Sequence, residues 1–144
     1  MKIKIRKAKK SDVEAIYNLG MATKEFWVSP QTKFYTKKEL YNWLKNPKEN
    51  TLLIALCNNK VVGFSFTKIM SVEWAVVDTM AISLEFRGLG IGILLVKEGT
   101  KLLKKKGINL ISGLVGTEHL KAIKFWKKIG YRMGKKFFWM ERNI

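Results

Sequence analysis

The sequence contains very few of the residues that build metal centres and disulfides. Among its 144 residues there is one cysteine and one histidine. The single thiol, Cys57, cannot form an intrachain disulfide, and it rules out a zinc cluster built from cysteines. The lone histidine, His119, excludes the histidine-rich sites that hold most catalytic metals. We therefore expect a protein without a metal centre.

Long hydrophobic runs are also missing. No segment reaches the roughly 18 uncharged apolar residues that a transmembrane helix needs. The first residues alternate charged and apolar side chains, as a strand does, and they lack the apolar block of a signal peptide. The 47% of apolar residues is ordinary for a globular protein. We expect a single cytoplasmic domain over residues 1–144 that does not bind membranes.

Acidic residues are scarce, because the chain has 11 of them against 28 basic residues and a formal net charge of +17. Residues 1–72 carry 14 basic and 5 acidic residues, and residues 73–144 carry 14 and 6, so the excess is spread evenly. Only 4 basic residues are arginine, the residue that pairs bidentately with phosphate and guanine. A solvated lysine surface and a face for nucleic acid both stay open, and either attracts anionic ligands.

The spacing of apolar and turn residues predicts alternating strands and helices. Two capping boxes, Ser11 to Glu14 and Thr36 to Glu39, predict helix starts. The expected strands span 2–8, 51–57, 60–70, 73–84 and 108–115, with a final hairpin over 131–141, and the expected helices span 11–21, 36–46, 92–107 and 118–129. The fold class is therefore α/β (α+β), with a mixed, mostly antiparallel central sheet of six or seven strands and about four flanking helices.

The segment Arg87-Gly-Leu-Gly-Ile-Gly92 carries the strongest chemical signal. Its glycines lie between an apolar strand and a helix, where a tight turn and the free N–H groups of the helix start attract phosphate. The segment lacks the Lys-Ser/Thr of a Walker loop, and it lacks the third glycine and acidic partner of a dinucleotide fingerprint. The remaining pattern is Arg-x-x-Gly-x-Gly, and the alternative is a turn whose glycines serve packing alone.

The surroundings of this loop resemble one protein family. Residues 78–92, followed by a helix, a strand and Phe125-Trp-Lys-Lys-Ile-Gly-Tyr131, resemble the GCN5-related N-acetyltransferase (GNAT) family, and the opening over 5–16 is typical of it. The resemblance covers nearly the whole chain. It implies acetyl-CoA as the cofactor and a splayed pair of strands in the sheet. The residues that it assigns to acetyl-CoA are Met80, Ala81, Ile82, Arg87, Gly88, Leu89, Gly90, Ile91, Gly92, Ile93 and His119.

The same resemblance implies that a neutral amine attacks the thioester directly, after a base has removed a proton from the ammonium. Asp78 is the first candidate base and Glu73 the second, and the backbone N–H of Ile82 would stabilise the oxyanion. Asp78 stands four residues before Ile82, which predicts that both side chains share a face. The alternative for Asp78 is an ion pair with a lysine. His119 is a further candidate for a catalytic acid or base or for a contact with the pantetheine arm of acetyl-CoA. The alternative is a surface histidine without such a role.

Three positions depart from the family pattern. Leu114 stands where several members carry a glutamate, His119 where an asparagine touches the cofactor arm, and Trp126 where a tyrosine often protonates the thiolate. An indole is no usable acid, and the spacing of Trp126 favours core packing. The sequence therefore supports cofactor binding more strongly than the chemical step.

The leading hypothesis is an N-acetyltransferase that moves the acetyl group of acetyl-CoA to a primary amine of a protein or small molecule. The charge of +17 favours an acidic macromolecule as the acceptor. The alternatives are an acetyl-CoA-binding sensor without turnover and a basic nucleic-acid-associated protein, although the even charge counts against the second. The aromatic loop over 23–35 is expected either to wall the acceptor site or to dock on the core. The sequence predicts no oligomeric state.

Overall fold

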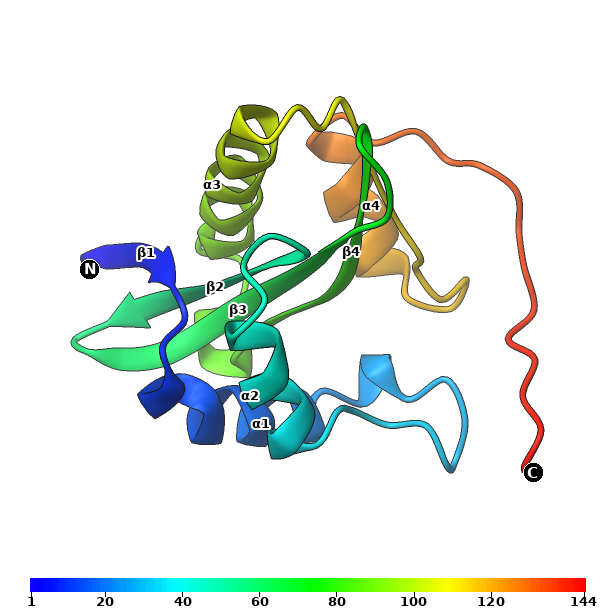
Figure 1. The fold of residues 1–144 in the computed structure, drawn as a ribbon, viewed down its shortest axis with the longest axis horizontal. Coiled ribbons are helices and arrows are strands. Elements are labelled where there is room, and N and C mark those ends of the chain that lie inside the picture. The colour runs from blue at the N-terminus through cyan, green and yellow to red at the C-terminus, as the bar shows by residue number, and fades with distance from the viewer.

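The computed structural model describes residues 1–144 and contains one sheet with helices on both faces (Figure 1). The strands are β1 (Ile3–Lys7), β2 (Asn50–Cys57), β3 (Lys60–Ile69), β4 (Trp74–Ile82) and β5 (Leu110–Gly113). The helices are α1 (Val13–Ala22), α2 (Lys37–Leu44), α3 (Ile91–Lys105) and α4 (Leu120–Lys128). Three short 3-10 turns are η1 (Lys10–Asp12), η2 (Lys24–Phe26) and η3 (Leu84–Phe86). No helix is both long and apolar enough to cross a membrane.

The strands lie side by side in chain order, and every neighbouring pair is antiparallel except β4 and β5, which are parallel. The hairpin between β2 and β3 turns at Asn58 and Asn59, whose φ angles of 48° and 62° are the left-handed values that such turns require. The parallel pair needs a crossover, which α3 provides. The predicted mixed α/β fold with four helices is therefore confirmed.

Two apolar layers cover the sheet, α1 and α2 on one face and α3 on the other (Figure 1). All eight residues of β2 are buried, because helices cover both of its faces. Leu52, Ile54 and Leu56 pack toward α1 and α2, while Leu53 and Cys57 pack toward α3. Alternation along the strand thus feeds two separate cores.

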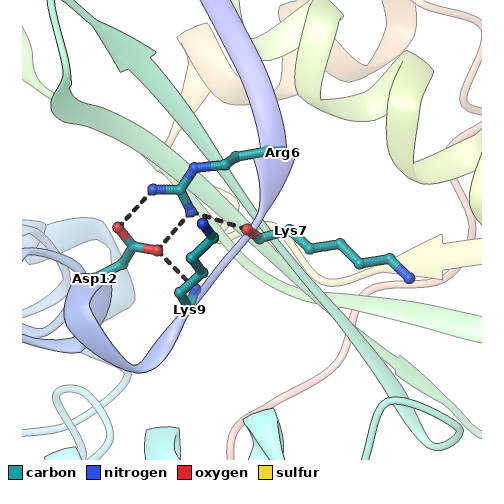
Figure 2. A network of polar contacts seen from close by, with 4 residues as sticks. All are labelled: Arg6, Lys7, Lys9 and Asp12. Carbon is teal, nitrogen blue, oxygen red and sulfur yellow. Dashed lines mark hydrogen bonds and ion pairs between the residues drawn. The ribbon is translucent and has the colours of Figure 1, made fainter.

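The junction of β1 and α1 corrects the first helix start. The predicted capping box at Ser11 is replaced by η1, and α1 begins only at Val13. The carboxylate of Asp12 accepts hydrogen bonds from Arg6 Nη1 at 2.7 Å and from the backbone N–H of Lys9 at 2.6 Å (Figure 2). Burial alone would raise the pKa of Asp12, but these hydrogen bonds outweigh it and hold the pKa below its usual value. The side chain of Asp12, and not that of Ser11, therefore stabilises the junction of β1 and α1.

The sheet has five strands, so the expectation of six or seven was wrong. The missing strands are those of the hairpin expected over 131–141, where the chain runs without regular structure along the outside of the molecule (Figure 1). Only three residues lie between Gly130 and Gly134, too few for a first strand, and an isolated hairpin is marginal in water. The tail is held instead by Glu141, which accepts a hydrogen bond from Thr32 Oγ1 at 2.9 Å.

Candidate active site

The sheet opens at the C-terminal half of β4. β4 pairs with β5 only from Trp74 to Val77, opposite Leu110 to Gly113, and it then continues to Ile82 with no strand on that side. We call residues 78–82 of β4 the open edge. The opening that the expected splayed pair would leave beside β4 is therefore present from Asp78 onward, because β5 ends at Gly113.

Hydrogen bonding to β3 decides which backbone groups face the open edge. The N–H of Ser83 donates to Val62 O at 2.9 Å, so the peptide groups of Ala81 also turn toward β3. Those of Met80 and Ile82 point the other way, into the side that β5 leaves vacant. Two of the three residues expected to contact the pantetheine arm thus direct peptide groups toward the open edge, although the carbonyl oxygen of Ile82 accepts a hydrogen bond from Arg87. Ala81 is held by its hydrogen bonds to β3.

The glycine loop after β4 leads directly into α3. Gly88 and Gly90 have φ angles of +77° and +81°, and a Cβ at either would meet no atom within 4 Å, so the loop is open on this side. Gly90 is the N-cap of α3, and no side chain caps the helix. The first N–H groups of α3, from Ile91 to Ile93, are therefore available to an anion.

Gly92 has a different task, which is packing. A Cβ at this position would lie 3.1 Å from Phe125 of α4 and 3.7 Å from the methyl group of Met80. The missing side chain lets α4 approach the start of α3 beside the open edge. Packing thus accounts for Gly92, whereas at Gly90 the glycine permits a left-handed backbone conformation.

Arg87 braces the loop from within the protein. Its Nε donates to the carbonyl oxygen of Ile82 at 3.0 Å, and its Nη1 pairs with Glu25 Oε1 of η2 at 2.8 Å. Burial alone would raise the pKa of Glu25, but hydrogen bonds from its own backbone and from Arg87 lower it, with a smaller contribution from the nearby His119. The guanidinium of Arg87 is thus engaged by protein groups beside the open edge.

A β-bulge determines where the carboxylate of Asp78 points. Thr79 pairs with Phe66 and Val77 with Thr67, so Asp78 is the one extra residue on β4. The side chain of Asp78 contacts Tyr35 on the α1 and α2 face, whereas Ile82 packs in the α3 core. The prediction that Asp78 and Ile82 share a face was wrong, because the bulge interrupts the alternation on which it depended.

Asp78 lies in a cluster with Tyr35 and Lys68. Tyr35 donates its hydroxyl to Asp78 Oδ2 at 2.6 Å, and Lys68 Nζ lies 3.2 Å from Asp78 Oδ1. Burial and then the bond to Asp78 raise the pKa of Tyr35, so the phenol stays protonated. The ion pair that was the alternative for Asp78 is therefore present, and a base role is compatible with it only when Lys68 moves or loses its charge.

Aromatic rings surround the same lysine. Lys68 Nζ lies 5.1 Å from the ring centroid of Tyr35, 5.2 Å from that of Trp43 and 5.5 Å from that of Phe66. We call these three rings the aromatic box. Lys68 was missed by sequence analysis, although its position two residues after Phe66 on one strand places both side chains on the same face.

The structure does not bring the other predicted catalytic residues to Asp78. Glu73 lies in the bend before β4, where its carbonyl accepts the N–H groups of Asn109 and Leu110, at the paired end of the strand. His119 is the N-cap of α4, and its Nε2 lies 3.2 Å from Glu118. Trp126 packs against Phe125 and Tyr131, as its spacing predicts, and Leu114 is exposed after β5.

Comparisons with known proteins match the sequence of this chain to acetyltransferases. Residues 13–131 match the acetyltransferase (GNAT) family. An uncharacterized N-acetyltransferase of Methanocaldococcus jannaschii is 30% identical over an alignment of 110 positions that covers 69% of this chain and 49% of that protein. The chain thus spans about half the length of this curated relative.

Solved structures share the fold. A transcriptional regulator from Bacillus halodurans aligns with a TM-score of 0.79 at 19% identity, over 98% of this chain and 100% of that one. The paia N-acetyltransferase from Thermoplasma acidophilum, solved in complex with coenzyme A, aligns with a TM-score of 0.74 at 22% identity, over 95% of this chain and 94% of that one.

Proposed function

Because the chain belongs to the acetyltransferase (GNAT) family, we propose that it transfers the acetyl group of acetyl-CoA to a primary amine by direct attack. The observation that carries the proposal is the open edge of β4 running into the glycine-capped start of α3. One feature offers peptide groups and the other offers helix N–H groups, so together they suit a ligand with amides and a diphosphate.

The diphosphate, the pantetheine amides and the thioester oxygen of acetyl-CoA would each have a matching group. The diphosphate would take the N–H groups of residues 88–93, and the amides of the pantetheine arm would pair with Met80 and Ile82. The N–H of Ile82 would also donate to the thioester oxygen as negative charge develops there. Arg87, which is held by Glu25 and Ile82, and His119 at the start of α4 would flank this binding site.

We assign to Asp78 the role of the base that removes a proton from the acceptor ammonium. The bulge places its carboxylate at the end of the open edge that adjoins the paired part of β4, on the face of the sheet that α1 and α2 cover. Tyr35 donates to that carboxylate and cannot take the proton itself, because its phenol stays protonated. The net charge of +17 favours an acceptor carried by an acidic macromolecule over a free polycation.

The test joins calorimetry with acetyl-CoA to an assay of CoA release on a panel of amines, peptides and proteins. Asp78→Asn should lower turnover by about 10²–10⁴ and leave acetyl-CoA affinity unchanged. Glu73→Gln removes the other carboxylate of this segment and should keep turnover, because Glu73 lies at the paired end of β4. If Asp78→Asn keeps full turnover, Asp78 is not the base. If the protein does not bind acetyl-CoA, the proposed acetyltransferase function is wrong.

A second candidate function is an acetyl-CoA-binding module without turnover. It is favoured by the contact of Asp78 with Lys68, which already neutralises the carboxylate, and by Leu114 and Trp126 at the family's catalytic positions. Tight acetyl-CoA binding with no CoA release on any acceptor would identify this second function.

A further inference from the structure

Lys68 is the lysine whose amine lies beside the candidate base. Only two lysines form ion pairs with carboxylates, Lys37 with Glu14 on the helical face and Lys68 with Asp78. The ammonium of Lys68 is also held over the three rings of the aromatic box. The surrounding groups thus bind a primary alkylammonium, and the one that they bind belongs to the protein.

This lysine lies at the point where the sheet opens. Asp78 directly follows Val77, the last residue of β4 that pairs with β5. A pantetheine arm bound along Met80 and Ile82 would bring its thioester toward this end of the open edge, which is the part of the argument that rests on the proposed function. The transfer requires the aliphatic arm of Lys68 to turn from the aromatic box toward the open edge, and at 36% exposure this side chain is not buried by the protein.

We propose that this protein acetylates its own Lys68. The carboxylate of Asp78 accepts a proton from the ammonium of Lys68, and the neutral amine attacks the acetyl carbonyl of acetyl-CoA. A C–N bond forms as the C–S bond breaks, and CoA leaves as the thiolate, which takes up the proton that the attacking nitrogen loses as it becomes an amide. Asp78 then releases the proton of the ammonium to solvent. The products are N-acetyl-Lys68 and free CoA.

The modification changes the acceptor site. An acetylated lysine has no positive charge, so it cannot pair with Asp78 or hold a cation over the aromatic box. Asp78 is then left with Tyr35 as its hydrogen-bond partner, and its carboxylate is free to bind the ammonium of an external acceptor. Self-acetylation of Lys68 thus converts a site filled by the protein's own amine into one open to another.

The experiment incubates the purified full chain with acetyl-CoA and follows each lysine by peptide mass spectrometry. Lys60, exposed at the start of the same strand, reports the background of spontaneous acetylation. Lys68 should be modified at least about tenfold faster than Lys60, because it is held next to a base. Asp78→Asn should reduce Lys68 to the rate of Lys60, and Lys68→Arg should abolish the fast phase while Lys60 is unaffected.

Calorimetry on the same samples separates the two proposals. If acetyl-CoA binds and external amines are acetylated while Lys68 reacts no faster than Lys60, self-acetylation is wrong and the transferase function stands. If acetyl-CoA does not bind, both are wrong. A fractional rate at Lys68 that rises with protein concentration also overturns the inference, because the transfer then occurs between copies.

Discussion

Replacing Gly90 by alanine isolates the backbone conformation on which the glycine loop depends. Gly90 has a φ angle of +81°, and a Cβ there would meet no atom within 4 Å. The cost of Gly90→Ala is therefore backbone strain alone, about 1–2 kcal/mol for an L-residue in the left-handed region. For a chain of this length, that loss lowers the melting temperature by roughly 2–8 °C.

The same substitution should weaken acetyl-CoA binding. The N–H groups of Ile91 to Ile93 are oriented by the left-handed N-cap, and relaxing φ at Gly90 turns them away from a common point. The new methyl group also projects into the open space that the diphosphate would occupy. A loss of one good charge-assisted hydrogen bond corresponds to about a tenfold increase in Kd. Calorimetric titration of wild type and Gly90→Ala with acetyl-CoA measures this change in Kd.

Two other glycines provide matched controls. Gly130 has a φ of +98° with no neighbour within 4 Å, and it lies beyond the C-terminal end of α4. Gly130→Ala should lose similar stability and keep full affinity. Gly134 has equal space and no left-handed φ, so Gly134→Ala should lose neither. If Gly90→Ala and Gly130→Ala are equally destabilised and bind acetyl-CoA equally well, the loop is not the diphosphate site.

Three further substitutions test the scaffold. Asp12→Asn should cost about 1–3 kcal/mol at neutral pH. Because the folded pKa of Asp12 is lowered, this contribution is full above the unfolded value of about 3.9 and is lost as the pH falls through the folded pKa. Urea unfolding should show that the difference in the free energy of unfolding between wild type and Asp12→Asn is smaller at pH 3 than at pH 7. An equal difference at both pH values would contradict the stabilising role of the Asp12 carboxylate. Gly63→Ala would place a Cβ 2.6 Å from Ile82 Cδ1 and should cost about 1–3 kcal/mol, whereas Gly99→Ala in α3, with its nearest contact at 3.7 Å, should stabilise by up to about 1 kcal/mol in thermal melts.

Helix starts could be predicted where the decisive contacts are local. The capping box at Thr36 is present, because Thr36 and Glu39 satisfy each other's backbone groups three residues apart. The similar pattern at Ser11 failed, because Asp12 binds Arg6 from the preceding strand. A bidentate ion pair to a residue outside the helix outweighs a hydroxyl cap, and the sequence pattern does not contain that partner's position.

The glycine loop was the most predictable part of the candidate site. Only eight residues, which include η3, separate the end of β4 from the start of α3, so the relative placement of strand, glycine turn and helix depends on backbone geometry within one short segment. The contacts of Arg87 with Glu25 and of Gly92 with Phe125 come from distant parts of the chain. No pattern in the loop itself could have indicated them.

The position of Asp78 depends on a feature that leaves no mark in the sequence. Without the bulge, strict alternation would put its carboxylate on the face of Met80 and Ile82, in the apolar core beneath α3. An unpaired carboxylate buried there would cost several kcal/mol. One extra residue in β4 instead turns Asp78 toward Tyr35 and Lys68, which supply a phenol and an ammonium. The need to pair this charge therefore accounts for the contacts of Asp78 with Tyr35 and Lys68.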